Sequence, residues 1–170
     1  MTEAEAVTAL QDAFWLAGEE LMFRHTNPWE LDEALVAAGF TMGPCEAQDL
    51  LGLEKVLARQ SGRPIPILPR MVAEGRLGKI GGVGFYRYPG GGGAVIDPLI
   101  EDLILEEAWF ARISRSEISD NELVLRMHAA LKPICKKLLG SGWDKDALIG
   151  LLQKAVHFPP DASLRRLGLI

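Results

Sequence analysis

The stretch that decides the fold reads GFTMGPCEAQDLLGL over residues 39–53 and continues, after a spacer, as GRLGKIGGVGFYRY over residues 75–88. Gly43-Pro44 is a turn signal, and Pro44 suits the first position of the helix that follows the turn. Gly75 stands where a glycine commonly ends a helix, here a short one predicted over residues 66–74. The glycines of residues 78–88 are too dense for a helix and predict a non-helical excursion.

These motifs, in this order and spacing, resemble the C-terminal domain of the L-3-hydroxyacyl-CoA dehydrogenases. In that family an MGP turn leads into a D-x-x-G-L-(D/E) helix, and a G-(K/R)-x-T-G-x-G-F-Y-x-Y segment follows. Ile80 stands where the family usually has threonine. The resemblance implies an all-α helical bundle of the type found in the C-terminal domain of 6-phosphogluconate dehydrogenase.

The chain also contains an internal repeat. Residues 40–53 (FTMGPCEAQDLLGL) and residues 156–169 (VHFPPDASLRRLGL) share a proline and a Leu-Gly-Leu ending at an offset of 116 residues. Because each copy follows a long helix, a tryptophan and a helix that starts with acidic residues, duplication is the better interpretation. We therefore expect two related lobes, residues 1–89 and 97–170, joined by a glycine-rich linker at residues 90–96. The resemblance implies the same, because multifunctional fatty-acid-oxidation dehydrogenases carry two such domains in tandem.

Apolar periodicity and capping residues predict the helices. A helix is expected over residues 3–24, and Asn27-Pro28 starts a second one that stops at Gly39. Further helices are expected over residues 44–60 and 66–74, from Asp97-Pro98 onward, over 119–139, 144–156 and 161–167. Pro133 should kink or restart the helix over residues 119–139. Residues 83–86 can form a short extended piece.

Composition excludes several classes of protein. With 170 residues and 48% hydrophobic content, the chain can bury a core as one domain or two small lobes. A net charge of −5 argues against nucleic acid as a partner, and no apolar run is long enough to span a membrane. Cys45 and Cys135 form no CxxC pair, and the N-terminus is acidic, so a reduced, cytoplasmic protein is expected.

No catalytic residue is predicted. A dinucleotide site needs a strand, a G-x-G-x-x-G turn and a helix, whereas Gly82-Val83-Gly84 follows no apolar strand and leads into Pro89. The resemblance implies that the catalytic His and Glu belong to a nucleotide-binding domain absent here, so NAD is expected only if a separate Rossmann domain exists. The family's substrate-contacting Asn-Arg pair falls at Val7 and Thr8, neither of which can replace an amide.

Other polar groups favour structural roles. His25, His128 and His157 lack the spacing of metal ligands, so no metal is expected. Glu46 and Asp49 suit the start of a helix, and Cys45 is better interpreted as a buried thiol than as a reactive one. The tryptophans are expected to anchor the core: Trp15, Trp29, Trp109 and Trp143.

One substrate contact is predicted. Between Arg59 and Arg87 lie six cations and one acid, a local excess that could meet the phosphates of CoA, although a solvated basic face explains it as well. If a ligand site exists, Arg76 and Lys79 should bind the phosphate, because the glycines beside them let a ligand approach the backbone.

Three functions stay open. The first is a helical module of the 3-hydroxyacyl-CoA dehydrogenase type, which in the family dimerises and closes over acyl-CoA, without NAD-linked activity of its own. The second is an interaction or regulatory subunit that docks on a separate Rossmann-type or hydratase chain. The third is an independent non-redox enzyme acting on a thioester. A homodimer or hetero-complex is expected, because the helices over residues 3–24 and from 97 carry more apolar positions than one face can bury.

Overall fold

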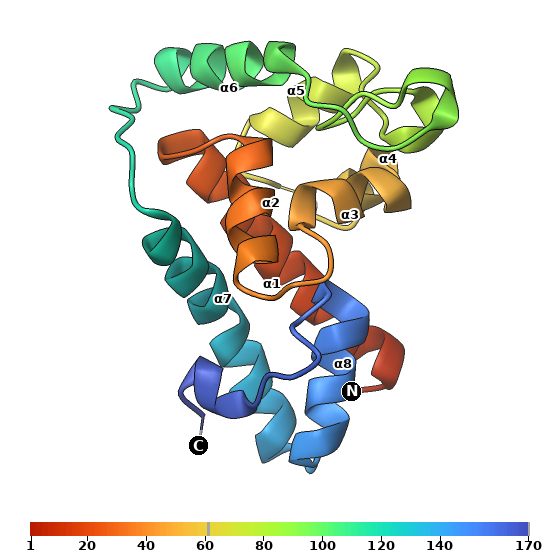
Figure 1. Ribbon diagram of the computed structural model, residues 1–170, viewed down its shortest axis with the longest axis vertical. Helices are drawn as coiled ribbons and strands as arrows, with labels where there is room; N and C mark the ends of the chain where they lie inside the picture. Colours follow the sequence, from red (N-terminus) through yellow and green to blue (C-terminus); the bar gives the residue numbers. More distant parts are fainter. Residues whose placement is uncertain (61, 170) are drawn as a thin grey trace.

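Helix α1 (Glu3–Arg24) is the central element of the computed structural model, which describes residues 1–60 and 62–169 (Figure 1). A capping box starts it: Thr2 Oγ1 accepts from the Glu5 N–H, and the Glu5 carboxylate accepts from the Thr2 N–H. Its apolar side chains are covered by α6, α7 and α8. Helix α1 is therefore not the exposed apolar surface that the sequence predicts.

The fold is all-α, as predicted. The other helices are α2 (Pro28–Ala37), α3 (Pro44–Leu51), α4 (Leu53–Ala58), α5 (Ile67–Ala73), α6 (Pro98–Phe110), α7 (Asp120–Gly140) and α8 (Lys145–Val156). Three short 3-10 helices are η1 (Lys79–Gly81), η2 (Pro89–Gly91) and η3 (Leu164–Leu167). In the described residues, the extended structure amounts to isolated bridges that pair Gly78 with Val83, Val83 with Arg87, and Arg87 with Val95.

Three helix predictions need correction. The helix expected over residues 44–60 is broken at Gly52, whose φ of 105° is open to glycine but strained for other residues. The Leu53 N–H donates instead to the carbonyl of Leu77, 3.0 Å away. Helix α7 is continuous over Asp120–Gly140, so the expected restart at Pro133 is wrong, whereas the alternative, a kink, stays a prediction; the carbonyl of exposed Ala129, which loses its donor, can face water. The last helix is only η3.

The internal repeat is visible in the order of the elements. A long helix and then a shorter one occur first as α1 and α2 and again as α7 and α8. The N-caps repeat as well, with Asn27 accepting from the Glu30 N–H and Asp144 from the Ala147 N–H. Gly52 and Gly168, matched in the sequence, both have positive φ. This order of elements fits two related lobes, and the division at residues 90–96 stays a prediction.

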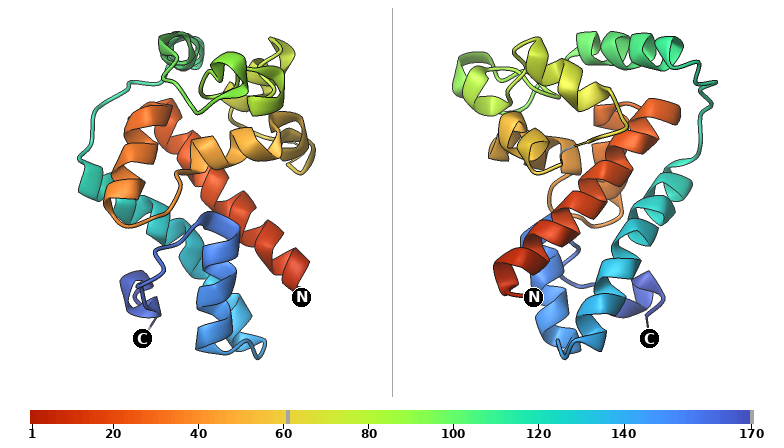
Figure 2. Two further views of the ribbon diagram at one scale, coloured as in Figure 1. Left: turned by 45° about the vertical axis from the view of Figure 1, so that its right-hand side comes forward. Right: turned by 180° about the vertical axis from the view of Figure 1, so that it is seen from behind.

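The lobes share one hydrophobic core. Where they meet, the rings of Phe40 and Phe158 lie edge to face with centroids 5.5 Å apart, and the Thr41 N–H donates to the carbonyl of His157 at 3.0 Å. The segment between α6 and α7 is tied to the end of α1, where Arg115 donates to the carbonyls of Met22 and Thr26. Figure 2 shows this segment running along the edge of the molecule from α6 to α7. None of the helices among the described residues is long and apolar enough to cross a membrane.

Candidate functional site

The glycine-rich excursion over residues 78–88 is held by the buried carboxylate of Asp49, in the last turn of α3. Its Oδ1 accepts from the Phe85 N–H at 2.9 Å, and its Oδ2 accepts from the Tyr86 N–H at 3.0 Å and the Tyr88 hydroxyl at 2.7 Å. Three donors from a non-helical segment thus converge on one side chain. Asp49 therefore fixes the shape of the excursion. The sequence predicts only that Asp49 suits the start of a helix, which does not account for this role.

A second buried carboxylate, Asp32 on α2, closes the turn before α3. It accepts from the N–H groups of Cys45 at 2.9 Å and Glu46 at 3.0 Å, which are unsatisfied donors of the first turn of α3. It also accepts from the Tyr86 hydroxyl at 2.8 Å. Tyr86 thus donates its N–H to Asp49 and its O–H to Asp32, which links α2, α3 and the excursion.

The glycines of the motifs leave room for these carboxylates. A Cβ at Gly43 would lie 2.2 Å from Cγ of Asp32, and a Cβ at Gly84 would lie 2.1 Å from Oδ1 of Asp49. At Gly78 it would lie 2.4 Å from the Asp49 carbonyl oxygen. The Asp49 carboxylate therefore fills the space beside Gly84, and the absence of a dinucleotide site stays a prediction.

Burial perturbs both carboxyls. Loss of hydration raises the pKa of Asp32 to about 7 and that of Asp49 to about 6, against hydrogen bonds that lower each pKa. Burial and the nearby carboxylates also raise the pKa of the Cys45 thiol well above its usual range. The prediction of a buried Cys45 is confirmed, and its thiolate is disfavoured.

Of the two predicted phosphate ligands, Lys79 lies on the excursion and Arg76 lies just before it, and the two are engaged differently. The Arg76 guanidinium donates to Oδ2 of Asp97 at 2.8 Å and to the Gly84 carbonyl at 3.0 Å, and its side chain is only 11% exposed. The Lys79 ammonium lies 5.8 Å from the centre of the Tyr88 ring. The structure therefore gives Arg76 an internal partner, with which a phosphate would have to compete. Binding of a phosphate by this pair stays a prediction.

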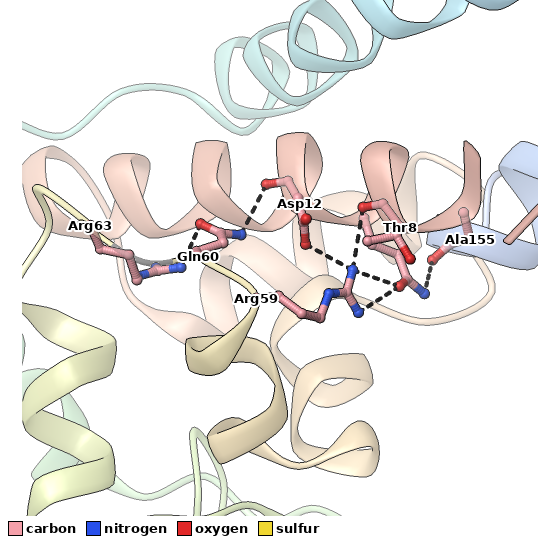
Figure 3. A network of polar contacts seen from close by, with 7 residues as sticks. Thr8, Asp12, Arg59, Gln60, Arg63 and Ala155 are labelled. Carbon is pink, nitrogen blue, oxygen red and sulfur yellow. Dashed lines mark hydrogen bonds and ion pairs between the residues drawn. The ribbon is translucent and has the colours of Figure 1, made fainter. Parts of the chain in front are cut away.

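Most of the predicted basic stretch is paired within the chain. Figure 3 shows Arg59 reaching α1, where it donates to Oδ1 of Asp12 at 2.8 Å and to the Thr8 carbonyl at 3.3 Å. Arg63 donates to Gln60 at 2.6 Å and forms a buried ion pair with Glu19. Burial lowers the pKa of Arg63 to about 10. Arg59 and Arg63 connect the loop after α4 to α1, so these two side chains form neither a free phosphate site nor a solvated face.

A groove of about 530 Å³ opens beside the buried carboxylates. Trp29, Val36 and Ile96 supply much of its apolar surface, and the carboxylates of Glu33 and Glu46 lie with Asp32 along its wall. The negative charges make this groove unfavourable for a phosphate and suit it to an uncharged or cationic group.

The remaining predicted roles concern the tryptophans, a metal site and the pair Val7 and Thr8. Trp15 is buried in the core as predicted, but Trp109 is 79% exposed, so the prediction that it anchors the core is wrong. The described residues hold no group of three His, Cys, Asp or Glu side chains arranged to bind a metal. Val7 and Thr8 lie on α1 in the first lobe, and exposed Thr8 presents a hydroxyl where the family has an amide.

Sequence reasoning missed the shared role of Asp32, Tyr86 and Tyr88. A signal was present, because Asp32 places a carboxylate next to the apolar positions Leu31 and Leu35 of α2. A carboxylate in that position requires buried donors. Which donors they are depends on contacts across 54 residues of chain, in the case of the Tyr86 hydroxyl.

Comparison with known sequences finds a matching family model and several relatives. Residues 6–88 match the family model for the C-terminal domain of 3-hydroxyacyl-CoA dehydrogenase. A peroxisomal bifunctional enzyme of Danio rerio is 33% identical over 135 residues, covering 65% of this chain and 18% of that protein. A probable 3-hydroxyacyl-CoA dehydrogenase of Caenorhabditis elegans is 37% identical over 71 residues, covering 35% of this chain and 24% of that protein. The chain thus spans less than a quarter of the length of these curated relatives.

Solved structures share the fold. The dehydrogenase part of multifunctional enzyme 1 from C. elegans superposes with a TM-score of 0.75 at 19% identity, covering 98% of this chain and 42% of that one. The 3-hydroxybutyryl-CoA dehydrogenase of Escherichia coli gives a TM-score of 0.58 at 18% identity, covering 91% and 49%. The chain therefore has the helical C-terminal fold of the 3-hydroxyacyl-CoA dehydrogenases, and residues 6–88 match the C-terminal domain of that family.

Proposed function

We propose that this chain supplies the helical, acyl-CoA-closing module of a 3-hydroxyacyl-CoA dehydrogenase-type system in fatty-acid metabolism. The observation that carries the proposal is the family match over residues 6–88, together with relatives named as a bifunctional enzyme and a dehydrogenase. In this role the carboxylates of Asp32 and Asp49 hold the glycine-rich excursion rigid. Val7 and Thr8 cannot supply the amide that would contact substrate, so a partner must supply the chemistry.

The module alone is expected to have no NAD-linked activity. The Asp49 carboxylate fills the space beside Gly84, where it would compete with a pyrophosphate. The test is an NADH-oxidation assay of the purified chain with acetoacetyl-CoA, together with calorimetric titration of NADH. We expect neither turnover nor saturable binding. Turnover by the isolated chain, or NADH binding with a low-micromolar Kd, would contradict the proposal.

Acyl-CoA contact is tested through Arg76 and Lys79. Replacing both with alanine should weaken CoA binding by about 1.5–3 kcal/mol for each charged hydrogen bond removed. The matched control replaces Lys136 and Arg165, exposed cations of the second lobe, which changes net charge equally. Because Arg76→Ala also breaks the pair with Asp97, an Arg76→Lys variant that retains the charge serves as a fold control. Equal CoA affinity in the double mutant and the control would contradict the proposed phosphate site.

A second candidate, a non-catalytic interaction subunit, is favoured by the exposed aromatic side chains at the end of α6. We propose that the chain works in a complex, as a dimer or bound to a Rossmann-type or hydratase chain. We also propose a cytoplasmic location, supported by two free cysteines, Cys45 and Cys135. Imaging of a fluorescently tagged full-length protein tests the location, and peroxisomal puncta would contradict it.

A further inference from the structure

Helix α6 carries an apolar outer face that the described chain leaves uncovered. We call it the α6 outer face, and its exposed apolar side chains are Leu99 (63% exposed), Leu105 (42%), Trp109 (79%) and Phe110 (66%). They extend over about three helical turns, or roughly 16 Å. Monomeric proteins rarely keep so many large apolar groups on one exposed helix, and Trp is the residue most enriched in binding hot spots.

The opposite side of α6 already provides its attachment to the molecule. Ile100, Leu103, Ile104 and Ala108 are buried and form the stripe that packs on α1 and α5. Figures 1 and 2 show α6 at the periphery, with the bundle on one side only. The outer face is therefore not needed for the fold. Its side chains could be polar without loss of packing, so their apolar character points to a partner.

The charge around this face is strongly negative. Helix α6 contains four carboxylates and no basic residue: Glu101, Asp102, Glu106 and Glu107. Arg70 pairs with Glu106 at 3.4 Å and with Glu107 at 3.3 Å, but it also pairs with Glu74, so one cation serves three carboxylates. Asp102 is exposed beside the apolar side chains and has no ion-pair partner among the described residues.

The charge identifies the kind of partner. A second copy of the same face would bring the Asp102 and Glu106 carboxylates toward like charges, which is destabilising. An anionic membrane surface would repel the face for the same reason. An amphipathic helix with apolar residues at i, i+3, i+4 and i+7, flanked by Lys or Arg, satisfies both the apolar side chains and the carboxylates.

The end of α6 offers a seat for an anchoring side chain. Trp109 and Phe110 line a depression of about 580 Å³ with Arg112, Ile113 and Ser114. Arg112 is the only basic residue between Pro98 and Ile113, so the partner's cations should lie over the Asp102 end. We propose that the α6 outer face binds a basic amphipathic helix of a partner protein, with an apolar anchor between Trp109 and Phe110. This inference does not depend on the acyl-CoA role.

The test uses a fluorescein-labelled synthetic helix of about 15 residues with leucines at the four anchor positions and lysines beside them. A second peptide has glutamate in place of each lysine. Fluorescence anisotropy should show saturable binding of the basic peptide only, weakened as NaCl rises from about 50 to about 500 mM. The double variant Trp109→Ala, Phe110→Ala should bind at least roughly 10-fold more weakly. Asp102→Lys should weaken the basic peptide and strengthen the acidic one.

Leu125→Ala is the matched control, because Leu125 is an apolar side chain on α7 that is 61% exposed and outside this face. It should bind the basic peptide as the wild type does, and circular dichroism should show all variants folded. Several results would overturn the proposal: no binding of the basic peptide, equal binding of both peptides, or unchanged binding by the double variant. Two further results would also overturn it: a dimer seen in sedimentation that Trp109→Ala abolishes, or binding to phosphatidylcholine vesicles that Trp109→Ala abolishes. None of these measurements involves CoA or NADH, so they fail or succeed independently of the proposed function.

Discussion

Replacing Asp49 with alanine should strongly destabilise the first lobe. The change leaves three buried donors without their acceptor: the N–H groups of Phe85 and Tyr86 and the hydroxyl of Tyr88. An unsatisfied buried donor costs about 1–3 kcal/mol, which gives about 3–9 kcal/mol for three. Part of this loss in unfolding free energy is offset. A pKa raised to about 6 means that burial disfavours the ionised Asp49 carboxylate by about 3 kcal/mol, and the alanine variant does not bear that cost. The central expectation is a net loss of about 3 kcal/mol.

Urea denaturation followed by far-UV circular dichroism measures this loss. With a slope of about 2 kcal/mol per molar urea, the midpoint should fall by about 1.5 M. Hydrogen exchange adds a local measurement, since the amides of Phe85 and Tyr86 should lose protection before those of α7.

The internal repeat provides the matched control. Arg165 occupies the position that corresponds to Asp49 at the offset of 116 residues, and it is exposed. Arg165→Ala should change the unfolding free energy by no more than about 0.5 kcal/mol. Two results together would refute the idea that Asp49 holds the excursion. The unfolding free energies of Asp49→Ala and Arg165→Ala would differ by less than about 1 kcal/mol, and hydrogen exchange at Phe85 and Tyr86 would be unchanged.

Two further predictions concern the same carboxylates. Gly84→Ala should cost about 2–4 kcal/mol, because its Cβ would lie 2.1 Å from Oδ1 of Asp49, whereas Gly93→Ala, with open space around it, should be nearly neutral in the same urea assay. For Asp32, a folded-state pKa of about 7 lies above the unfolded value of about 3.9, so its protonation favours the folded state below pH 7 and this contribution is lost as pH rises. Relative to Asp32→Asn, the wild type should therefore lose about 2.5 kcal/mol of stability between about pH 5 and about pH 8; a difference that is constant with pH, or that grows in favour of the wild type, would contradict the assigned shift.

Local signals in the sequence were sufficient for most of the helices. Asn27 before Pro28, Asp97 before Pro98, and Ser119 with Glu122 mark starts that the structure reproduces, because a cap acts over three or four residues. Apolar periodicity located α1 over residues 3–24 without reference to any other element. The repeat was also readable from the sequence, since a matched order of helices requires no knowledge of how they pack.

Contacts between distant residues decided what local signals could not. Gly52 ends α3 because the next N–H pairs with Leu77, and Trp109 is exposed because the opposite stripe of α6 faces the bundle. Arg76 looked available for a phosphate, yet Asp97 engages it across 21 residues of chain. The sequence by itself determined the helices, their caps and the family motif, because these depend on neighbours along the chain. Which carboxylate meets which donor, and which face stays open, was decided only by the tertiary structure, because burial and hydrogen-bond partners are set by residues far apart in sequence.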